Sequence, residues 1–211
     1  MQHNKMARKV FFSFHYERDI KRIGQIRNSG LTKPDLESAG FTDAVSWESI
    51  KKQGTDAVKK WIADQMVGTS ITVVLIGAET SQREWVMHEI AESYKRGNAL
   101  VGIYIHNVMD LDRKTDIQGK NPFENFIIKN PSGQINLSQL GKTYDWVGDN
   151  GYNNLGKWIE EAVQERQKWT GGELIELDKS AFQQPGISSN VVSLQPERFK
   201  PKDPWSNAGH R

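Results

Sequence analysis

The chain has 211 residues, of which 36% are hydrophobic and 26% are charged, enough for one sizeable domain with a core and an appendage. Its 28 basic and 26 acidic residues leave a net charge of +2 and are scattered, which argues against a nucleic-acid partner. The absence of cysteine excludes disulfides, thiolate nucleophiles and cysteine-based metal sites, and it suits a reducing cytosol.

The apolar segments are too short for a membrane protein. The longest runs have the length of a strand, far below the ~20 residues that a membrane-spanning helix needs. The first six residues are polar and lead directly into a predicted strand, so the pattern of a signal peptide is missing. We therefore expect a cytoplasmic location and no membrane partner.

The first part of the chain predicts a strand followed by a helix. Residues 9–16 are aromatic and β-branched, which is typical of a buried strand. Residues 17–27 carry isoleucines at helical spacing between charged residues, and Asn28-Ser-Gly30 is expected to end this helix. Residues 43–48 are expected to form a short second strand.

The middle of the chain has the clearest α/β pattern. An amphipathic helix is predicted over residues 55–67, with Gly68 as its C-cap. Residues 71–76 are continuously apolar, as in a strand covered on both faces. A helix over 85–95 and a strand over 100–105 follow. Strands that alternate with helices indicate a parallel sheet, so we predict a flavodoxin-like, doubly wound α/β domain with helices on both faces.

The pattern weakens in the last half of the chain. Residues 107–139 are polar and rich in turns, as in a long insertion, and such insertions tend to be functional or mobile. Residues 143–147 are expected to form a last edge strand, and 153–167 a final helix. After residue 170 four prolines punctuate a segment without periodicity.

We accordingly divide the chain into a domain over residues 1–168, with an insertion at about 107–140, and a partly irregular C-terminal extension over 169–211.

The common catalytic signatures are absent from the sequence. No G-x-G-x-x-G follows the first predicted strand, no G-x-x-x-x-G-K-[ST] occurs, and no G-x-S-x-G is present. The five histidines lack paired metal-ligand spacing. We therefore expect neither a phosphate-cradling dehydrogenase or NTPase nor a metal site, and an active site would have to use carboxylates, aromatic rings and hydroxyls.

Glu89 is the leading candidate for such a carboxylate. It lies four residues after Trp85, so the two side chains share a face of the predicted helix. A carboxylate near the start of a helix is also stabilised by the positive end of the helix dipole. Taken alone, the sequence pattern around Glu89 favours this purely structural role. Its expected neighbours favour a site instead, because ligands of open α/β sheets bind past the carboxyl ends of the strands. The residues expected at that edge are Ser13, His15, Trp47, Glu48, Gly77, Glu79 and Ser81.

An ordered set of short segments resembles a known family. The stretches are Arg8-Lys-Val-Phe-Phe-Ser-Phe-His-Tyr16, Asp43-Ala-Val-Ser-Trp-Glu48, Val73-Val-Leu-Ile-Gly-Ala-Glu-Thr80 and Arg83-Glu-Trp-Val-Met-His-Glu-Ile90. In this order and spacing the chain resembles the TIR-like proteins of the Thoeris antiphage defence system, the ThsB family, over roughly residues 8 to 160.

The resemblance implies an activity. It implies that Glu89 is the catalytic glutamate of an enzyme that cleaves NAD⁺, releases nicotinamide and makes a cyclic or otherwise modified ADP-ribose. That product would activate a separate effector protein. NAD⁺ would be a substrate, so no cofactor is expected. A carboxylate suits this chemistry because it can stabilise the oxocarbenium-like ribose that forms as nicotinamide leaves.

The expected substrate-binding residues surround this glutamate. Aromatic rings at Phe11, Phe14, Tyr16 and Trp47 are candidates for holding the nicotinamide ring. The full set of substrate-binding candidates is Phe11, Ser13, His15, Tyr16, Trp47, Gly77 and Trp85. The aromatic residues of the first strand and Trp85 are also consistent with packing in the core. His15 is equally consistent with a site residue and with a polar residue at the edge of the sheet.

Two other functions remain open at the level of sequence. The chain could be a non-catalytic TIR adaptor that binds a phage component or assembles with itself. It could also be a nucleoside-processing relative, because other flavodoxin-like folds transfer deoxyribose with a glutamate. A phage trigger protein and a homo-oligomer are further partners that the resemblance suggests.

Overall fold

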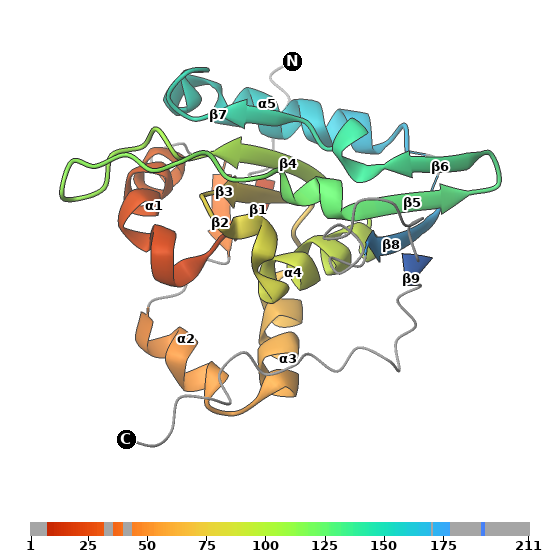
Figure 1. The fold of residues 1–211 in the computed structure, drawn as a ribbon, viewed down its shortest axis with the longest axis horizontal. Coiled ribbons are helices and arrows are strands. Elements are labelled where there is room, and N and C mark those ends of the chain that lie inside the picture. The colour runs from red at the N-terminus through yellow and green to blue at the C-terminus, as the bar shows by residue number, and fades with distance from the viewer. Residues whose placement is uncertain (1–7, 32–35, 40–43, 170, 178–190, 193–211) are drawn as a thin grey trace, which may run out of the picture.

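The computed structural model describes residues 8–31, 36–39, 44–169, 171–177 and 191–192, with backbone alone for residues 27–31, 36–39, 44–47 and 191–192 (Figure 1). No helix in this described part is long and apolar enough to cross a membrane.

The centre of the molecule is a five-stranded parallel sheet. Its order is β2-β1-β3-β4-β7. The strands are β1 (Arg8–Ser13), β2 (Leu36–Ala39), β3 (Ile71–Ile76), β4 (Ala99–Tyr104) and β7 (Thr143–Asp145). Counted along the chain, the order is 2-1-3-4-5, the flavodoxin-like doubly wound arrangement. The predicted fold class is thus confirmed.

Helices cover both faces of this sheet. One face packs on α1 (Tyr16–Leu31) and α5 (Gly151–Arg166), whose buried residues share an apolar cluster with those of β1, β3 and β4. The other face packs on α3 (Thr55–Gln65) and α4 (Glu84–Lys95), while α2 (Ala44–Lys51) precedes α3.

Alternation along β1 sends its side chains to different helices. Phe12 packs into the cluster with α1 and α5, whereas Phe11 packs with Val58 and Ile62 of α3. Successive residues of a strand point to opposite faces, so Ser13 shares the face of Phe11. The end of β1 therefore presents a hydroxyl toward the α3–α4 layer.

A second sheet, which the sequence pattern did not predict, packs beside α4. Its antiparallel order is β6-β5-β8-β9. The strands are β5 (Phe126–Asn130), β6 (Gly133–Asn136), β8 (Glu173–Leu177) and β9 (Val191–Val192), with 3-10 turns η2 (Pro122–Asn125) and η3 (Leu137–Gln139) next to β5 and β6. Phe123 and Phe126 anchor it in the apolar cluster of β3 and α4. In Figure 1 it lies at the right of the view, opposite α1.

One predicted element was wrong, and two others end at different residues from those predicted. The segment 43–48 was expected as a strand, but the backbone from Ala44 to Lys51 is helix α2, and the second strand is Leu36–Ala39. Helix α1 also continues to Leu31, through the Asn-Ser-Gly segment that was expected to end it. The helix can continue through Gly30 because a glycine inside a helix costs only about 1 kcal/mol. The first strand ends at Ser13 rather than Tyr16, and Tyr16 begins α1.

The C-cap of α3 is Met66 rather than the predicted Gly68, which follows two residues later with a positive φ of 76°. Gly97, with φ 77°, directly follows the C-cap of α4.

Candidate active site

The carboxyl ends of β1 and β3 meet the second turn of α4. Ser13 is the last residue of β1 and is paired with Val74 of β3, whose strand ends two residues later at Ile76. Glu89 is the sixth residue of α4. The arrows of β4 and β7 in Figure 1 point toward the same edge, at the left, where α1 and the segment after β4 also lie. This is the edge at which open α/β sheets bind ligands.

The carboxyl group of Glu89 is buried and held by one hydroxyl. Glu89 is 8% exposed, and Ser13 Oγ donates a hydrogen bond of 2.5 Å to its Oε2. Burial raises the pKa of Glu89 from 4.5 to about 8, and the Ser13 hydroxyl opposes this by favouring the ionised form. At neutral pH the resting side chain is therefore mostly protonated.

A second pair of hydroxyls fixes the helix turn that carries Glu89. Ser93 Oγ donates to the Glu89 carbonyl oxygen at 2.7 Å and lies 2.6 Å from Thr72 Oγ1 of β3. Both hydroxyl residues have no exposed surface. These bonds tie α4 to the middle of the sheet, so the position of Glu89 relative to Ser13 is set by buried contacts.

Phe11 and Trp85 lie in an apolar cluster with α3. Phe11 is 1% exposed and packs with Val58, Ile62 and Met66, while the partly buried Trp85 packs against the same group. These two rings hold α3 and α4 on β1. Their role as substrate contacts stays a prediction, and their packing role is what the geometry describes.

His15 and Tyr16 continue from the end of β1 into α1. His15 is 8% exposed, and its Nδ1 has no hydrogen-bond partner among the described residues. Burial lowers the pKa of His15, with a smaller effect from Arg83, so the imidazole is neutral near pH 7. The half-buried Tyr16 ring lies 6.0 Å from that of Phe14.

Gly77 leaves room for a carboxylate that the sequence analysis missed. A methyl group at Gly77 would overlap with the carboxyl group of Asp19. Asp19 is fully buried, neither of its carboxyl oxygens has a hydrogen-bond partner in the described part of the chain, and burial raises its pKa to about 6. The signal was its position, because Asp19 lies in the first turn of α1 and its backbone N–H donates to the His15 carbonyl oxygen at 3.0 Å.

Trp47 belongs to α2, and its side chain lies outside the described residues. Its predicted contact with substrate stays a prediction.

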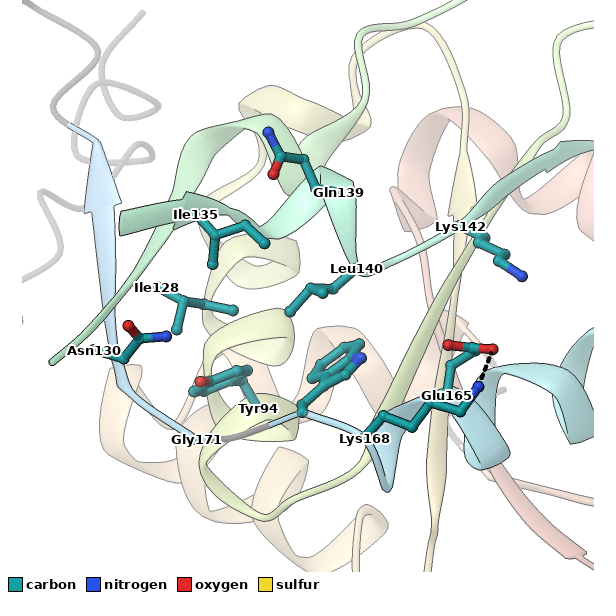
Figure 2. A pocket seen from close by; sticks show the side chains of 11 residues that line it. Tyr94, Ile128, Asn130, Ile135, Gln139, Leu140, Lys142, Glu165, Lys168 and Gly171 are labelled. Atoms are coloured by element: carbon teal, nitrogen blue, oxygen red, sulfur yellow. Dashed lines mark hydrogen bonds and ion pairs between the residues drawn. The ribbon is translucent and has the colours of Figure 1, made fainter. Parts of the chain in front are cut away.

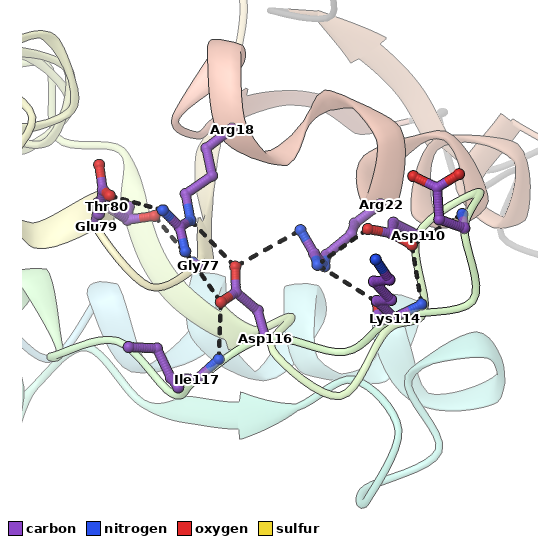
Figure 3. Close-up of polar contacts among 10 residues, drawn as sticks. Arg18, Arg22, Gly77, Glu79, Thr80, Asp110, Lys114, Asp116 and Ile117 are labelled. Atoms are coloured by element: carbon purple, nitrogen blue, oxygen red, sulfur yellow. Dashed lines mark hydrogen bonds and ion pairs between the residues drawn. The ribbon is translucent and has the colours of Figure 1, made fainter.

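The segment between β4 and η2, residues 105–121, crosses the same edge and is bound to α1 by ion pairs. Figure 3 shows Arg18 and Arg22 of α1 facing Asp116, with Asp110 and Glu79 at the two ends. Arg18 forms a bidentate pair with Asp116, with Nε–Oδ2 at 3.1 Å and Nη2–Oδ1 at 3.0 Å. The insertion thus contributes to this edge of the domain.

A cavity of about 230 Å³ lies elsewhere, against the second sheet (Figure 2). Tyr94 of α4, Trp169 after α5 and Ile128 of β5 form part of its wall. None of the candidate site residues lines it. Within the described residues, no group of three or more His, Cys, Asp or Glu side chains could hold a metal ion.

The 2-1-3-4-5 parallel sheet and the buried Glu89 on the helix after β3 agree with the TIR-like class that the resemblance implies. A family profile described as "Thoeris protein ThsB, TIR-like domain" matches residues 11–110. A Bacillus cereus (strain MSX-D12) protein named "Putative cyclic ADP-D-ribose synthase ThsB1" is 32% identical over 191 residues, which cover 73% of this chain and 100% of the relative. The chain belongs to the Thoeris ThsB family, as the sequence analysis predicted.

Proposed function

We propose that this protein cleaves the bond between nicotinamide and ribose in NAD⁺ and closes the remaining ADP-ribose into a cyclic signal. The observation that carries the proposal is the buried Glu89 carboxyl group, held by Ser13 at the carboxyl edge of a TIR-like sheet. The name of the Bacillus cereus relative, a cyclic ADP-D-ribose synthase, supports the class of reaction.

The proposed chemistry uses the charge of Glu89. The pyridinium nitrogen of nicotinamide becomes neutral when it leaves with the bonding electrons, and the ribose carbon becomes oxocarbenium-like. An ionised carboxylate next to that carbon stabilises the developing positive charge, and it does so strongly in a buried site. The pyridinium of the bound substrate is itself a cation, so substrate binding favours the ionised form of a glutamate whose resting pKa is about 8.

Ring closure then requires a nucleophile from the substrate in place of water. A hydroxyl oxygen or adenine nitrogen of the same molecule attacks the ribose carbon and loses one proton, so NAD⁺ gives cyclic ADP-ribose, nicotinamide and H⁺. Exclusion of water from the closed site favours this outcome over hydrolysis. The segment over residues 105–121, which covers this edge, is suited to that exclusion.

The wider role follows from the family. We propose that the cyclic product diffuses through the cytoplasm to a separate effector protein, and that a phage component triggers its synthesis. Assembly into a homo-oligomer is a further proposal.

The test is nicotinamide release by the Glu89→Gln variant. The amide keeps the shape and accepts the Ser13 hydrogen bond, but it cannot ionise, so nicotinamide and cyclic product should both fall by at least 100-fold. Glu92→Gln is the matched control, since Glu92 lies on the same helix but pairs with Arg96 near the surface. Both products are measured by mass spectrometry in cells that express the protein during infection. Undiminished turnover by Glu89→Gln would refute the assigned role, and a wild-type protein without any product would favour an adaptor.

A further inference from the structure

Two arginines of α1 converge on a single carboxylate. Arg18 and Arg22 lie one helical turn apart, so their side chains extend in the same direction. Arg18 holds Asp116 through two parallel hydrogen bonds, and Arg22 Nη1 approaches Asp116 Oδ2 at 3.6 Å. The Arg18 guanidinium, which hydrogen-bonds this carboxylate, lowers the pKa of Asp116. Asp116 is therefore an anion held by two cations.

One member of this pair, Arg18, lies near the candidate site residue His15. The electrostatic surroundings of His15 include Arg18 and Arg83 as cations, and Glu17 and Glu79 as anions. His15 follows Ser13 by two residues, and Ser13 donates to Glu89. A dinucleotide whose nicotinamide ribose lies at Glu89 must place its diphosphate a short distance away, and Arg18 borders this edge because it bonds Glu79 after β3 and Asp116 after β4.

The geometry of the pair suits a phosphate. A guanidinium that forms two parallel hydrogen bonds with a carboxylate can form the same two with phosphate oxygens. Arg22 has a further unfilled donor, because its Nε is buried without a hydrogen-bond partner among the described residues. Its Nη2 reaches only long contacts, 3.4 Å to Asp110 Oδ2 and 3.3 Å to the Lys114 carbonyl oxygen.

The segment that carries Asp116 is held to α1 mainly by polar contacts. Ile105 and Val108 at its start are buried in the core, whereas Met109, Leu111 and Ile117 are exposed by 51%, 78% and 72%. In the ion-pair cluster, the Arg18 side chain is 36% exposed, while those of Asp116 and Arg22 are 15% and 8% exposed. A displacement confined to residues 109–117 would therefore release the arginines without uncovering Ile105 or Val108.

We propose that Arg18 and Arg22 bind the diphosphate of the dinucleotide, and that Asp116 occupies this subsite until substrate displaces it. The inference rests on the proposed function for the identity of the ligand. It makes the ion pair of Figure 3 a competitor of the substrate. Removal of the anion then improves binding, whereas removal of the cation weakens it.

The experiment compares the two sides of the ion pair by calorimetry. In the Glu89→Gln background, which binds without turnover, Asp116→Asn should lower the Kd for NAD⁺ about fivefold. Arg18→Gln should raise it at least tenfold, and Arg18→Lys, which keeps the charge but loses the two parallel bonds, should lie between. Nicotinamide riboside, which lacks the diphosphate, should bind all variants equally. Arg96→Gln on α4 is the matched control for loss of a surface arginine.

A merely structural ion pair predicts a different result. Asp116→Asn and Arg18→Gln would then break the same contact and shift the NAD⁺ affinity in the same direction, which would overturn the inference. An equal effect on nicotinamide riboside would overturn it as well. The proposed function fails separately, if wild-type protein binds NAD⁺ in the expected pattern but releases no nicotinamide.

Discussion

Burial of Glu89 should make the native protein less stable than a variant with a neutral side chain. The pKa of Glu89 rises from 4.5 to about 8 on folding, so the folded state binds this proton more tightly than the unfolded state. For an acid with a raised pKa, the stabilising contribution is complete below pH 4.5 and is lost as the pH rises through 8. Glu89→Gln, which stays neutral at every pH, does not suffer this loss.

The magnitude follows from the two pKa values. Each pH unit between them corresponds to about 1.4 kcal/mol of unfolding free energy. The free energy of unfolding of Glu89→Gln should therefore exceed that of the wild type by roughly 3 kcal/mol at pH 7 and by about 5 kcal/mol above pH 8. At pH 5 the difference should fall below about 1 kcal/mol. For a protein of this size, the value at pH 7 corresponds to a Tm increase of roughly 6 to 12 °C.

The assay is thermal unfolding of both proteins from pH 5 to pH 9, together with Glu92→Gln. The control exchanges the same groups in a near-surface ion pair, so its Tm should follow the wild type within about 2 °C at each pH. Parallel pH curves for Glu89→Gln and wild type would show that burial does not raise the pKa of Glu89. If the wild type were more stable than Glu89→Gln at pH 8, the ionised Glu89 would stabilise the folded state, which is the opposite of the expected effect.

Three further outcomes concern the same edge of the sheet. The kcat/KM for nicotinamide release should rise with pH up to about 8, because the ionised form of Glu89 is required; a rate that falls over this range would contradict that requirement. Ser13→Ala should shift this rising limb to higher pH and lower kcat/KM at pH 7 about tenfold or more. Ser13→Thr, which keeps a hydroxyl, should retain most activity. An unshifted pH profile for Ser13→Ala would show that the Ser13 hydroxyl does not influence the ionisation of Glu89. Gly77→Ala should destabilise the protein by ~1–3 kcal/mol through overlap with the Asp19 carboxyl group, and adding Asp19→Ala should recover part of this in denaturant unfolding; strictly additive effects would place the strain elsewhere.

Elements with a continuous local pattern were predictable from sequence. The strand Ile71–Ile76 matches its predicted limits because every residue in it is buried, and α4 and β4 differ from theirs by one residue at their ends. Helix α2 was missed because Val45 and Trp47 alternate with polar residues, which imitates a strand. The second sheet was missed because β5 and β8 are short and far apart in sequence, so their pairing leaves no local trace.

The part of the candidate site that depends on local periodicity was also predictable from the sequence. Period-two alternation along β1 and helical spacing in α4 both aim side chains at one edge, and the structure brings Ser13 and Glu89 together there. The contact between Arg18 and Asp116 joins residues 98 positions apart. Long-range ion pairs depend on the path of an irregular segment, which composition and periodicity do not determine.

The pairing of β8 with β5 has a consequence for shortened versions of the protein. A chain that stops at residue 168 ends α5 intact but removes the neighbour of β5, whose backbone amide and carbonyl groups then face solvent along an open edge. Such an edge recruits strands from other molecules. Fragments that stop at residue 168 should therefore aggregate, whereas those that extend through Leu177 keep the edge of β5 covered.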